Sequence, residues 1–304
     1  MKHLVSIRDI SKEDILELID LAAQIEASPS TYADRLKGKI MATLFYEPST
    51  RTRLSFESAM LRLGGKVIGF SDAKVSSAKK GESIADTIRM AASYADVIVL
   101  RHFLEGSGRV AVEFSDVPVI SGGTGIQEHP TQALLDVYTI YKHFGSLEDL
   151  TLGLVGDLRY GRTIPSLLYA LSKFDNNKVF LLSPPELRPR MSVLNDVKGK
   201  LEAIIRQDLR SYIDEVDVLY MTRVQKERFP DEASYERVKD FYILTEDLAR
   251  MMNQKSIIMH PLPRVNEISY EVDHLPQAKY FEQARNGVWM RMAILLKLIG
   301  ENHE

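Results

Sequence analysis

The sequence contains no cysteine, and this absence excludes several kinds of chemistry at once. A chain of 304 residues without cysteine forms no disulfides, holds no metal through thiolates and has no cysteine nucleophile. The N-terminal stretch "MKHLVSIRDISKEDIL" carries charge throughout, and no later stretch approaches about 18 uninterrupted apolar residues. We therefore predict a cytoplasmic protein that does not enter a membrane.

The chain also lacks a strong charge of either sign. Its formal net charge is −3, which gives no general attraction to nucleic acid or to an anionic membrane. There is no P-loop, "GLVGDLRYG" lacks the G-x-G-x-x-G spacing of dinucleotide sites, and the 7 histidines show no metal-ligand spacing. The sequence predicts no metal, no cofactor and no nucleic-acid partner, so a bound anion must be held by a local cluster of cations.

What the sequence does contain is a regular alternation of apolar runs and helical periods. Between the apolar runs, hydrophobic residues recur at i, i+3, i+4 and i+7, for example at positions 56, 59, 60 and 63. This alternation is typical of βαβ units, in which helices cover both faces of a parallel sheet. We predict an α/β protein with two parallel sheets, whose strands lie at 40–46, 97–100, 117–120, 152–155, 179–182, 216–221 and 256–259.

The length of the chain favours two domains. We place the border within "KHFGSLEDLT" (142–151), where a helix ends at Gly145 and a polar link precedes a new strand. This gives one domain at 1–144 and a second at 145–284. The pattern leaves open whether residues 285–304, most of a last apolar helix, pack back on the first domain.

Polar and cationic segments follow six of the seven predicted strands. Ligands of open parallel sheets bind just beyond the carboxyl ends of the strands, so these segments are the candidate sites. They are "STRTR" (49–53), "RH" (101–102), "SGGTGIQEHPTQ" (121–132), "GDLRYGRT" (156–163), "TRVQKER" (222–228) and "HPLPR" (260–264).

The segment "STRTR" predicts an anion site. A helix N-terminus is already positive, so Arg51 and Arg53 are unfavourable there by about 0.3–1 kcal/mol each unless an anion binds between them. Ser49, Thr50 and Thr52 add hydroxyl donors to the free N–H groups of the first turn, which together form a cradle for phosphate or carboxylate. The alternative is that Ser49 is only a helix cap and the arginines are solvated.

Other segments leave two interpretations open. Arg101 is either a surface charge at a strand end or part of the anion site, and His129 is either a packed polar group or a partner of Gln132. The loop "VSSAKKGESIADTI" (75–88) is either solvated charge or a mobile lysine segment that closes over a phosphate. Residue pattern alone does not decide between these interpretations.

Seven collinear motifs, which span nearly the whole chain, resemble the catalytic chains of aspartate carbamoyltransferases. They are "FYEPSTRTRLSFESAMLRLGG", "KKGES", "LRH", "EHPTQALLD", "VGDLRYGRT", "YMTRVQKERF" and "MHPLPRVNEI". The related ornithine carbamoyltransferases carry H-C-L-P where this chain has H-P-L-P at 260–263. Independently of the resemblance, Arg162, Arg223 and Arg264 favour a second substrate with two carboxylates, because arginine binds carboxylate bidentately.

The resemblance implies transfer of the carbamoyl group of carbamoyl phosphate to L-aspartate, in a cleft between the two domains. Thr52, Arg101 and His129 would polarise the carbonyl oxygen, and Arg51, Lys80 and Gln132 would complete the catalytic set. The resemblance assigns carbamoyl phosphate to Ser49, Thr50, Arg51, Thr52, Ser76, Lys80, Arg101, His129, Gln132, Pro261 and Leu262. It assigns aspartate to Lys80, Arg162, Arg223, Gln225 and Leu262.

The resemblance also implies a homotrimer, in which Ser76 and Lys80 serve the site of a neighbouring subunit. Glu47 and Asp157 would hold the arginines in place. A separate regulatory chain is a further possible partner that the sequence neither requires nor excludes. Two alternatives remain: an inactive anion-binding scaffold that keeps the fold, and a carbamoyltransferase for another amino acid such as ornithine.

Four positions depart from the family pattern: Glu128, Phe103, the segment "SGGTG" and Pro165. Glu128 stands where an amide is usual. A carboxylate beside His129 would raise the pKa of that histidine, so we predict a shifted pH profile for the enzyme.

Overall fold

A computed structural model describes residues 1–75 and 77–300 of the chain. They form two compact units: a first unit of Met1–Tyr138 together with the chain from Arg285 onward, and a second unit of Thr139–Ala284. Both divisions fall inside helices, α5 (Pro130–Phe144) and α10 (Tyr280–Ile299). The border predicted after residue 144 lies at the end of α5, whereas the structural division lies within this helix.

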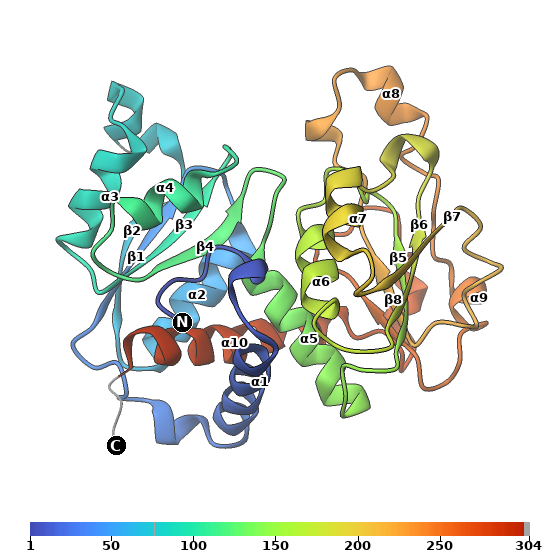
Figure 1. The fold of residues 1–304 in the computed structure, drawn as a ribbon, viewed down its shortest axis with the longest axis horizontal. Coiled ribbons are helices and arrows are strands. Elements are labelled where there is room, and N and C mark those ends of the chain that lie inside the picture. The colour runs from blue at the N-terminus through green and yellow to red at the C-terminus, as the bar shows by residue number, and fades with distance from the viewer. Residues whose placement is uncertain (76, 301–304) are drawn as a thin grey trace. The chain divides into compact units, whose positions relative to one another are not determined.

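The first unit is built on a four-stranded parallel sheet with the order β2-β1-β3-β4 (Figure 1). Helix α2 covers one face of this sheet, and α3 and α4 cover the other, as right-handed crossovers require. The elements are α1 (Lys12–Ala27), β1 (Ile40–Phe45), α2 (Thr50–Arg62), β2 (Lys66–Phe70), α3 (Ile84–Ala92), β3 (Val97–His102), α4 (Ser107–Glu113), β4 (Val119–Thr124) and α5, with the last turns of the chain in α10.

The two central strands of this sheet carry its core. Ala42 and Leu44 of β1 and Ile98 and Leu100 of β3 are at most 5 % exposed and pack against apolar residues of α3 and α4. In register, Leu44 lies opposite Leu100. Because β1 and β3 are buried on both faces, the positions of their carboxyl ends are fixed. The segments that follow these strands therefore start from fixed positions.

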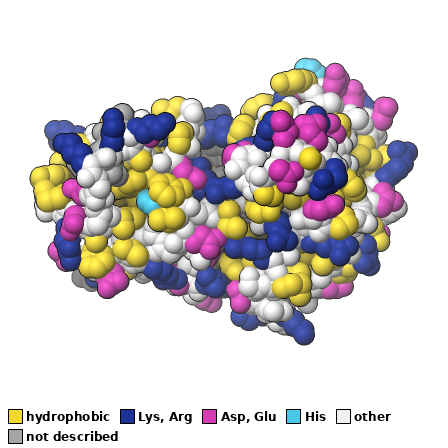
Figure 2. Space-filling model, turned by 90° about the horizontal axis from the view of Figure 1, so that it is seen from above, with side chains coloured by type: hydrophobic (Ala, Val, Ile, Leu, Met, Phe, Trp, Pro, Cys, Tyr) yellow, Lys and Arg dark blue, Asp and Glu magenta, His cyan; other side chains and the backbone are white. Residues whose placement is uncertain are grey.

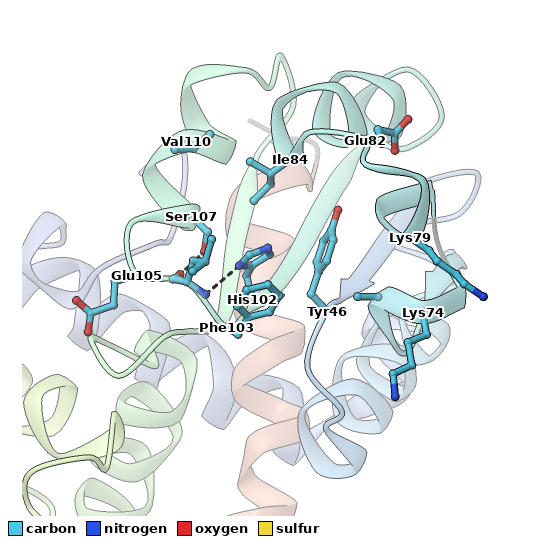
Figure 3. A pocket seen from close by; sticks show the side chains of 12 residues that line it. Tyr46, Lys74, Lys79, Glu82, Ile84, His102, Phe103, Glu105, Ser107 and Val110 are labelled. Carbon is cyan, nitrogen blue, oxygen red and sulfur yellow. Dashed lines mark hydrogen bonds between the residues drawn. The ribbon is translucent and has the colours of Figure 1, made fainter. Parts of the chain in front are cut away.

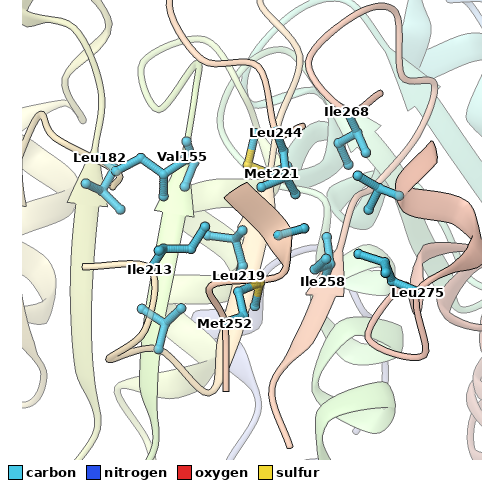
Figure 4. Close-up of a cluster of buried hydrophobic side chains, with 14 of the residues drawn as sticks. Val155, Leu182, Ile213, Leu219, Met221, Leu244, Met252, Ile258, Ile268 and Leu275 are labelled. Atoms are coloured by element: carbon cyan, nitrogen blue, oxygen red, sulfur yellow. The ribbon is translucent and has the colours of Figure 1, made fainter. Parts of the chain in front are cut away.

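The second unit holds a five-stranded parallel sheet with the order β7-β6-β5-β8-β9. Apolar side chains of its strands pack with α9 and the segments around Leu244 and Ile268 in a second core (Figure 4). The elements are β5 (Thr151–Val155), α6 (Thr163–Leu171), β6 (Lys178–Leu182), α7 (Met191–Val197), β7 (Glu202–Arg206), β8 (Val218–Met221), α8 (Glu232–Glu236), α9 (Glu246–Ala249) and β9 (Ile257–Met259).

All seven predicted strands are present, and the predicted α/β class with two parallel sheets is confirmed. The prediction missed β2 and β7, which are edge strands of the two sheets. Their residues are exposed or only partly buried, so neither forms a continuous apolar run in the sequence. Within the described residues, no helix is both long and apolar enough to cross a bilayer.

Candidate active site

The candidate residues follow the strands at the topological switch point of each sheet, where neighbouring strands connect to helices on opposite faces. In the first unit β1 leads to α2 on one face while its neighbour β3 leads to α4 on the other, so a crevice opens at their carboxyl ends. Ser49 to Thr52 follow β1, and Arg101 lies near the end of β3. In the second unit β5 and β8 are neighbours of the same kind, followed by segments 156–163 and 222–228.

The first turn of α2 presents the predicted hydroxyls. Ser49 occupies the N-cap position but its side chain makes no capping hydrogen bond, so a purely capping role for Ser49 is not what the geometry shows. Thr52 is 7 % exposed and Arg51 is exposed. The anion argument was wrong for Arg53, because Arg53 Nε lies 2.6 Å from Glu57 Oε1 one helical turn further on.

Arg101 is fixed at the carboxyl end of β3. Its Nη1 donates to the carbonyl of Gly122 at 3.1 Å, and its Nε lies 3.6 Å from Glu47 Oε2. Both side chains are largely buried, at 13 % exposed for Arg101 and 19 % for Glu47. Glu47 therefore holds an arginine in place, as predicted.

His129 and Thr52 come together from two different segments. His129 is 5 % exposed, its Nε2 lies 3.4 Å from Thr52 Oγ1, and its Nδ1 lies 3.5 Å from Thr131 Oγ1. Gln132 lies in the first turn of α5, where its amide donates to Asp136 Oδ1 at 2.9 Å. The structure thus brings the hydroxyl and the imidazole assigned to the carbonyl oxygen within hydrogen-bonding range of each other.

Near Gln132 and its partner Asp136 lies a buried charge that the sequence did not single out. Arg291 of α10 is 3 % exposed and lies over the ring of Phe56 at 5.0 Å, and its Nη1 donates to Gly287 O at 3.0 Å. Burial lowers the pKa of Arg291 to about 10, while the nearby charge of Asp136 opposes this change. An arginine within the apolar period of the last helix was the available signal for this residue.

Glu128 has other partners than the ones assumed from its place in the sequence. Its carboxylate accepts from Ser6 Oγ at 2.6 Å and from the backbone N–H of Ile7 at 2.8 Å, and it lies 3.4 Å from Arg8 Nε. Burial raises the pKa of Glu128, although these hydrogen bonds oppose the change. Both carboxylate oxygens are directed at the N-terminal segment rather than at His129, and the predicted effect on that histidine stays a prediction.

The loop at 75–88, which was predicted to bring a lysine to the phosphate, is a separate segment of the first unit. Lys80 is exposed at the end of a 3-10 turn, Ser77–Lys80. Ser76, assigned with it, lies outside the described residues.

Asp157 organises the loops that follow β5 and β8. It is fully buried and accepts from the backbone N–H groups of Arg159 at 3.2 Å, Tyr160 at 2.9 Å and Gln225 at 3.3 Å. Burial raises the pKa of Asp157 to about 6, against the opposing effect of these three bonds and of Arg223. Asp157 was predicted to hold an arginine side chain, but these bonds are to backbone groups of both loops.

The predicted aspartate-binding arginines differ in their surroundings. Arg162 is the N-cap residue of α6, a place where the helix dipole favours an anion. Arg223 pairs with Glu227 through both terminal nitrogens, with Nη1 3.1 Å from Oε2. Arg264 also has a carboxylate partner within the protein, since its Nη2 donates to Asp273 Oδ2 at 2.6 Å, and its predicted part in binding a substrate carboxylate stays a prediction.

A pocket of about 490 Å³ in the first unit is a separate feature (Figure 3). Tyr46, Ile84, His102 and Phe103 are among the residues that line it, and none of the described lining residues is one that the resemblance assigns to a substrate. Tyr46 directly precedes Glu47, and His102 directly follows Arg101. Because successive strand residues point to opposite faces, this pocket lies on the other side of the sheet from Arg101.

Elsewhere on the visible surface, Lys and Arg side chains alternate with Asp and Glu (Figure 2). In residues 1–75 and 77–300, no group of three His, Asp or Glu side chains could hold a metal ion. The chemistry that this arrangement offers is therefore anion binding by fixed arginines, hydroxyl groups and helix N-termini, together with polarisation of a carbonyl group.

Comparison with known proteins gives a family for the whole chain. Residues 2–142 match "Aspartate/ornithine carbamoyltransferase, carbamoyl-P binding domain" and residues 148–298 match the "Asp/Orn binding domain" of the same family. The aspartate carbamoyltransferase catalytic subunit of Methanocaldococcus jannaschii is 53 % identical over 99 % of both chains, and that of Clostridium perfringens is 51 % identical over 99 % of this chain and 98 % of its own.

Solved structures agree with the sequence comparison. The catalytic subunit of M. jannaschii aspartate transcarbamoylase superposes with a TM-score of 0.90 over 98 % of both chains, at 53 % identity. The Trypanosoma cruzi aspartate transcarbamoylase, solved in complex with carbamoyl phosphate and aspartate, has a TM-score of 0.94 at 39 % identity, over 98 % of this chain and 97 % of its own. The chain belongs to the aspartate/ornithine carbamoyltransferase family.

Proposed function

We propose that this protein is an aspartate carbamoyltransferase, which transfers the carbamoyl group of carbamoyl phosphate to the amino group of L-aspartate. The products are N-carbamoyl-L-aspartate and phosphate. The observation that carries the proposal is the match over both domains to catalytic subunits named for aspartate, at 53 % and 51 % identity. The T. cruzi relative, solved with both substrates, supports the same assignment.

The first unit supplies the carbamoyl phosphate site in this proposal. Ser49, Thr50, Arg51 and Thr52 bind the phosphate with the free N–H groups of α2, and Arg101, held by Glu47, completes the cradle. Ser76 and Lys80 of a neighbouring subunit add to it.

The chemistry needs no protein nucleophile. The amine of aspartate attacks the carbonyl carbon, and the C–O bond to phosphate breaks as the tetrahedral intermediate collapses. Thr52, Arg101 and His129 stabilise the negative charge that develops on the carbonyl oxygen. The leaving phosphate accepts a proton from the amine. Catalysis then depends on alignment and charge stabilisation, for which effective molarities of about 10⁵ M or more are known.

The second unit supplies the aspartate site. Arg162 and Arg223 bind the two carboxylates with Gln225, whose backbone is held by Asp157. The carbonyl groups of Pro261 and Leu262 accept from the carbamoyl NH₂ group, together with Gln132 of the first unit. Lys80 and Leu262 contribute to both substrates.

The proposal extends to assembly and location. We propose a cytoplasmic homotrimer that acts in pyrimidine biosynthesis, and a separate regulatory chain as a possible further subunit. The relatives' name, "catalytic subunit", is in keeping with such an assembly. Sedimentation of the purified chain alone and with a candidate regulatory chain tests both points.

The activity is tested by offering carbamoyl phosphate with aspartate, ornithine, putrescine or N-acetylornithine in parallel. Formation of N-carbamoyl-L-aspartate alone supports the proposal, and turnover of another amine without aspartate would replace it with the second candidate function. Arg51→Ala should lower kcat/KM for carbamoyl phosphate by about 10- to 100-fold, the value of a charged hydrogen bond. Arg250→Ala, an exposed arginine at the end of α9, is the control. No turnover of any amine, with or without Arg51, would support the inactive scaffold.

A further inference from the structure

The segment that follows β9 contains a buried pair, His260 and Glu267, which takes no part in the proposed mechanism. We infer that this pair is a positioning device that fixes the backbone of Pro261 and Leu262 for substrate. The inference rests on the proposed function, in which the carbonyl groups of these two residues orient the carbamoyl NH₂ group.

Two hydrogen bonds of one imidazole ring connect the pair to the backbone. His260 Nε2 lies 2.6 Å from Glu267 Oε1, and the backbone N–H of Leu262 donates to His260 Nδ1 at 2.7 Å. The side chains of His260 and Glu267 are 1 % and 6 % exposed. Because Nδ1 accepts from an N–H group, the proton of the ring is on Nε2, where it is donated to Glu267. The neutral ring in one tautomer satisfies both bonds.

The ends of this segment are also fixed. The other carboxylate oxygen of Glu267 accepts from the backbone N–H groups of Val265 at 3.1 Å and Asn266 at 3.2 Å. The backbone N–H of His260 donates to Gln283 Oε1 at 2.8 Å, and Gln283 is 1 % exposed. One buried network thus holds both sides of Pro261 and Leu262 while those two residues are themselves partly exposed.

Leu262 needs such support because of its backbone conformation. Its φ is +53°, in the left-handed region that residues with a Cβ rarely adopt. A non-glycine residue persists there only when its surroundings determine the conformation, and such residues concentrate at functional sites. The bond from Leu262 N–H to His260 is the contact that fixes this peptide, and hence the directions of the neighbouring carbonyl groups.

Two substitutions of His260 separate the two halves of the device. In His260→Asn the amide oxygen can take the place of Nδ1 and accept from Leu262, whereas the contact with Glu267 is lost. In His260→Gln the amide nitrogen can take the place of Nε2 and donate to Glu267, but nothing remains to accept from Leu262. Each variant loses one buried hydrogen bond, but the bond to the Glu267 carboxylate is charge-assisted, so a merely structural role predicts that His260→Asn loses more stability and at least as much activity as His260→Gln.

The positioning role predicts different kinetics. His260→Gln should lower kcat by about tenfold or more, since small displacements of aligned groups have large effects on rate. His260→Asn should stay within about threefold of the wild type, even where urea unfolding shows it to be the less stable variant. Equal kcat values for the two variants would overturn the inference. The wild-type rate in the same assay tests the proposed function separately.

Amide hydrogen exchange at Leu262 tests the device without reference to any activity. Exchange should be faster in His260→Gln than in His260→Asn. Equal exchange rates would overturn the inference even if the wild type proved inactive. Unequal exchange together with equal kcat would also overturn it, because the segment would then be held without consequence for the reaction.

Discussion

Replacement of Asp157 by asparagine should change how the stability of the protein depends on pH. The carboxylate is fully buried between the loops that follow β5 and β8, and burial raises its pKa from the ordinary value of 3.8 to about 6. The folded protein therefore binds this proton more tightly than the unfolded chain does. As a result, the contribution of Asp157 to stability falls as the pH rises from about 4 to about 6 and stays low above that.

The size of the effect follows from the pKa difference. About two pKa units correspond to about 3 kcal/mol between full protonation and full ionisation. Roughly half of this is already lost at pH 5, so the fall that remains between pH 5 and pH 8 is about 1.5 kcal/mol. Asp157→Asn removes this ionisation. The difference in free energy of unfolding, variant minus wild type, should therefore rise by about 1.5 kcal/mol between pH 5 and pH 8.

The assay is urea unfolding of both proteins at pH 5, 6, 7 and 8, at one protein concentration. Asp217→Asn is the control, because Asp217 also accepts a backbone N–H at a strand start, from Thr151 at 2.8 Å, but is only partly buried. A difference between Asp157→Asn and wild type that stays constant from pH 5 to pH 8 would refute the reasoning. In Asp157→Asn the new side-chain NH₂ group would face a backbone N–H, either that of Gln225 or those of Arg159 and Tyr160, so we also expect a higher KM for aspartate.

Three further outcomes follow from the geometry. Glu227→Gln should raise the KM for aspartate several-fold, because Glu227 holds both terminal nitrogens of Arg223, and should leave the KM for carbamoyl phosphate unchanged. Steady-state kinetics in which each substrate is varied in turn test this prediction. Arg264→Lys should lower the free energy of unfolding by about 1.5–3 kcal/mol, because the paired bonds to Asp273 are lost. The KM for aspartate should stay unchanged, and a large rise in this KM would instead support Arg264 as a ligand of aspartate. Glu128→Gln should lower the melting temperature without moving the pH–rate profile, and a moved profile would support the original prediction for His129.

The fold was predictable where burial is complete. The inner strands β1, β3, β5, β6 and β8 are covered on both faces, and this leaves continuous apolar runs in the sequence. An edge strand such as β2 has a partner on one side only and is mostly exposed, so its residues need not be apolar. Pattern analysis therefore finds the buried strands, including the edge strands β4 and β9, and misses the exposed edge strands β2 and β7.

The candidate site was predictable in residue type but not in its partners. Strand ends and helix starts are local features, which is why Arg101 and Thr52 could be named in advance. The pairing of Arg53 with Glu57 was also local, at i and i+4, and could have been recognised. The bond between Glu128 and Ser6 joins residues 122 positions apart, so only tertiary packing reveals it.

These partners change the physical account of the site. Cations at a helix start were expected to be unfavourable until an anion arrives. In the structure, a carboxylate already faces two of the candidate arginines, Glu47 beside Arg101 and Glu227 beside Arg223. Such carboxylates reduce the repulsion between cations in the absence of substrate and fix each guanidinium in one orientation. In the proposed mechanism Arg101 is thereby oriented before substrate binds, so little rearrangement is needed when charge develops on the carbonyl oxygen, which is the condition under which fixed charges lower a reaction barrier most.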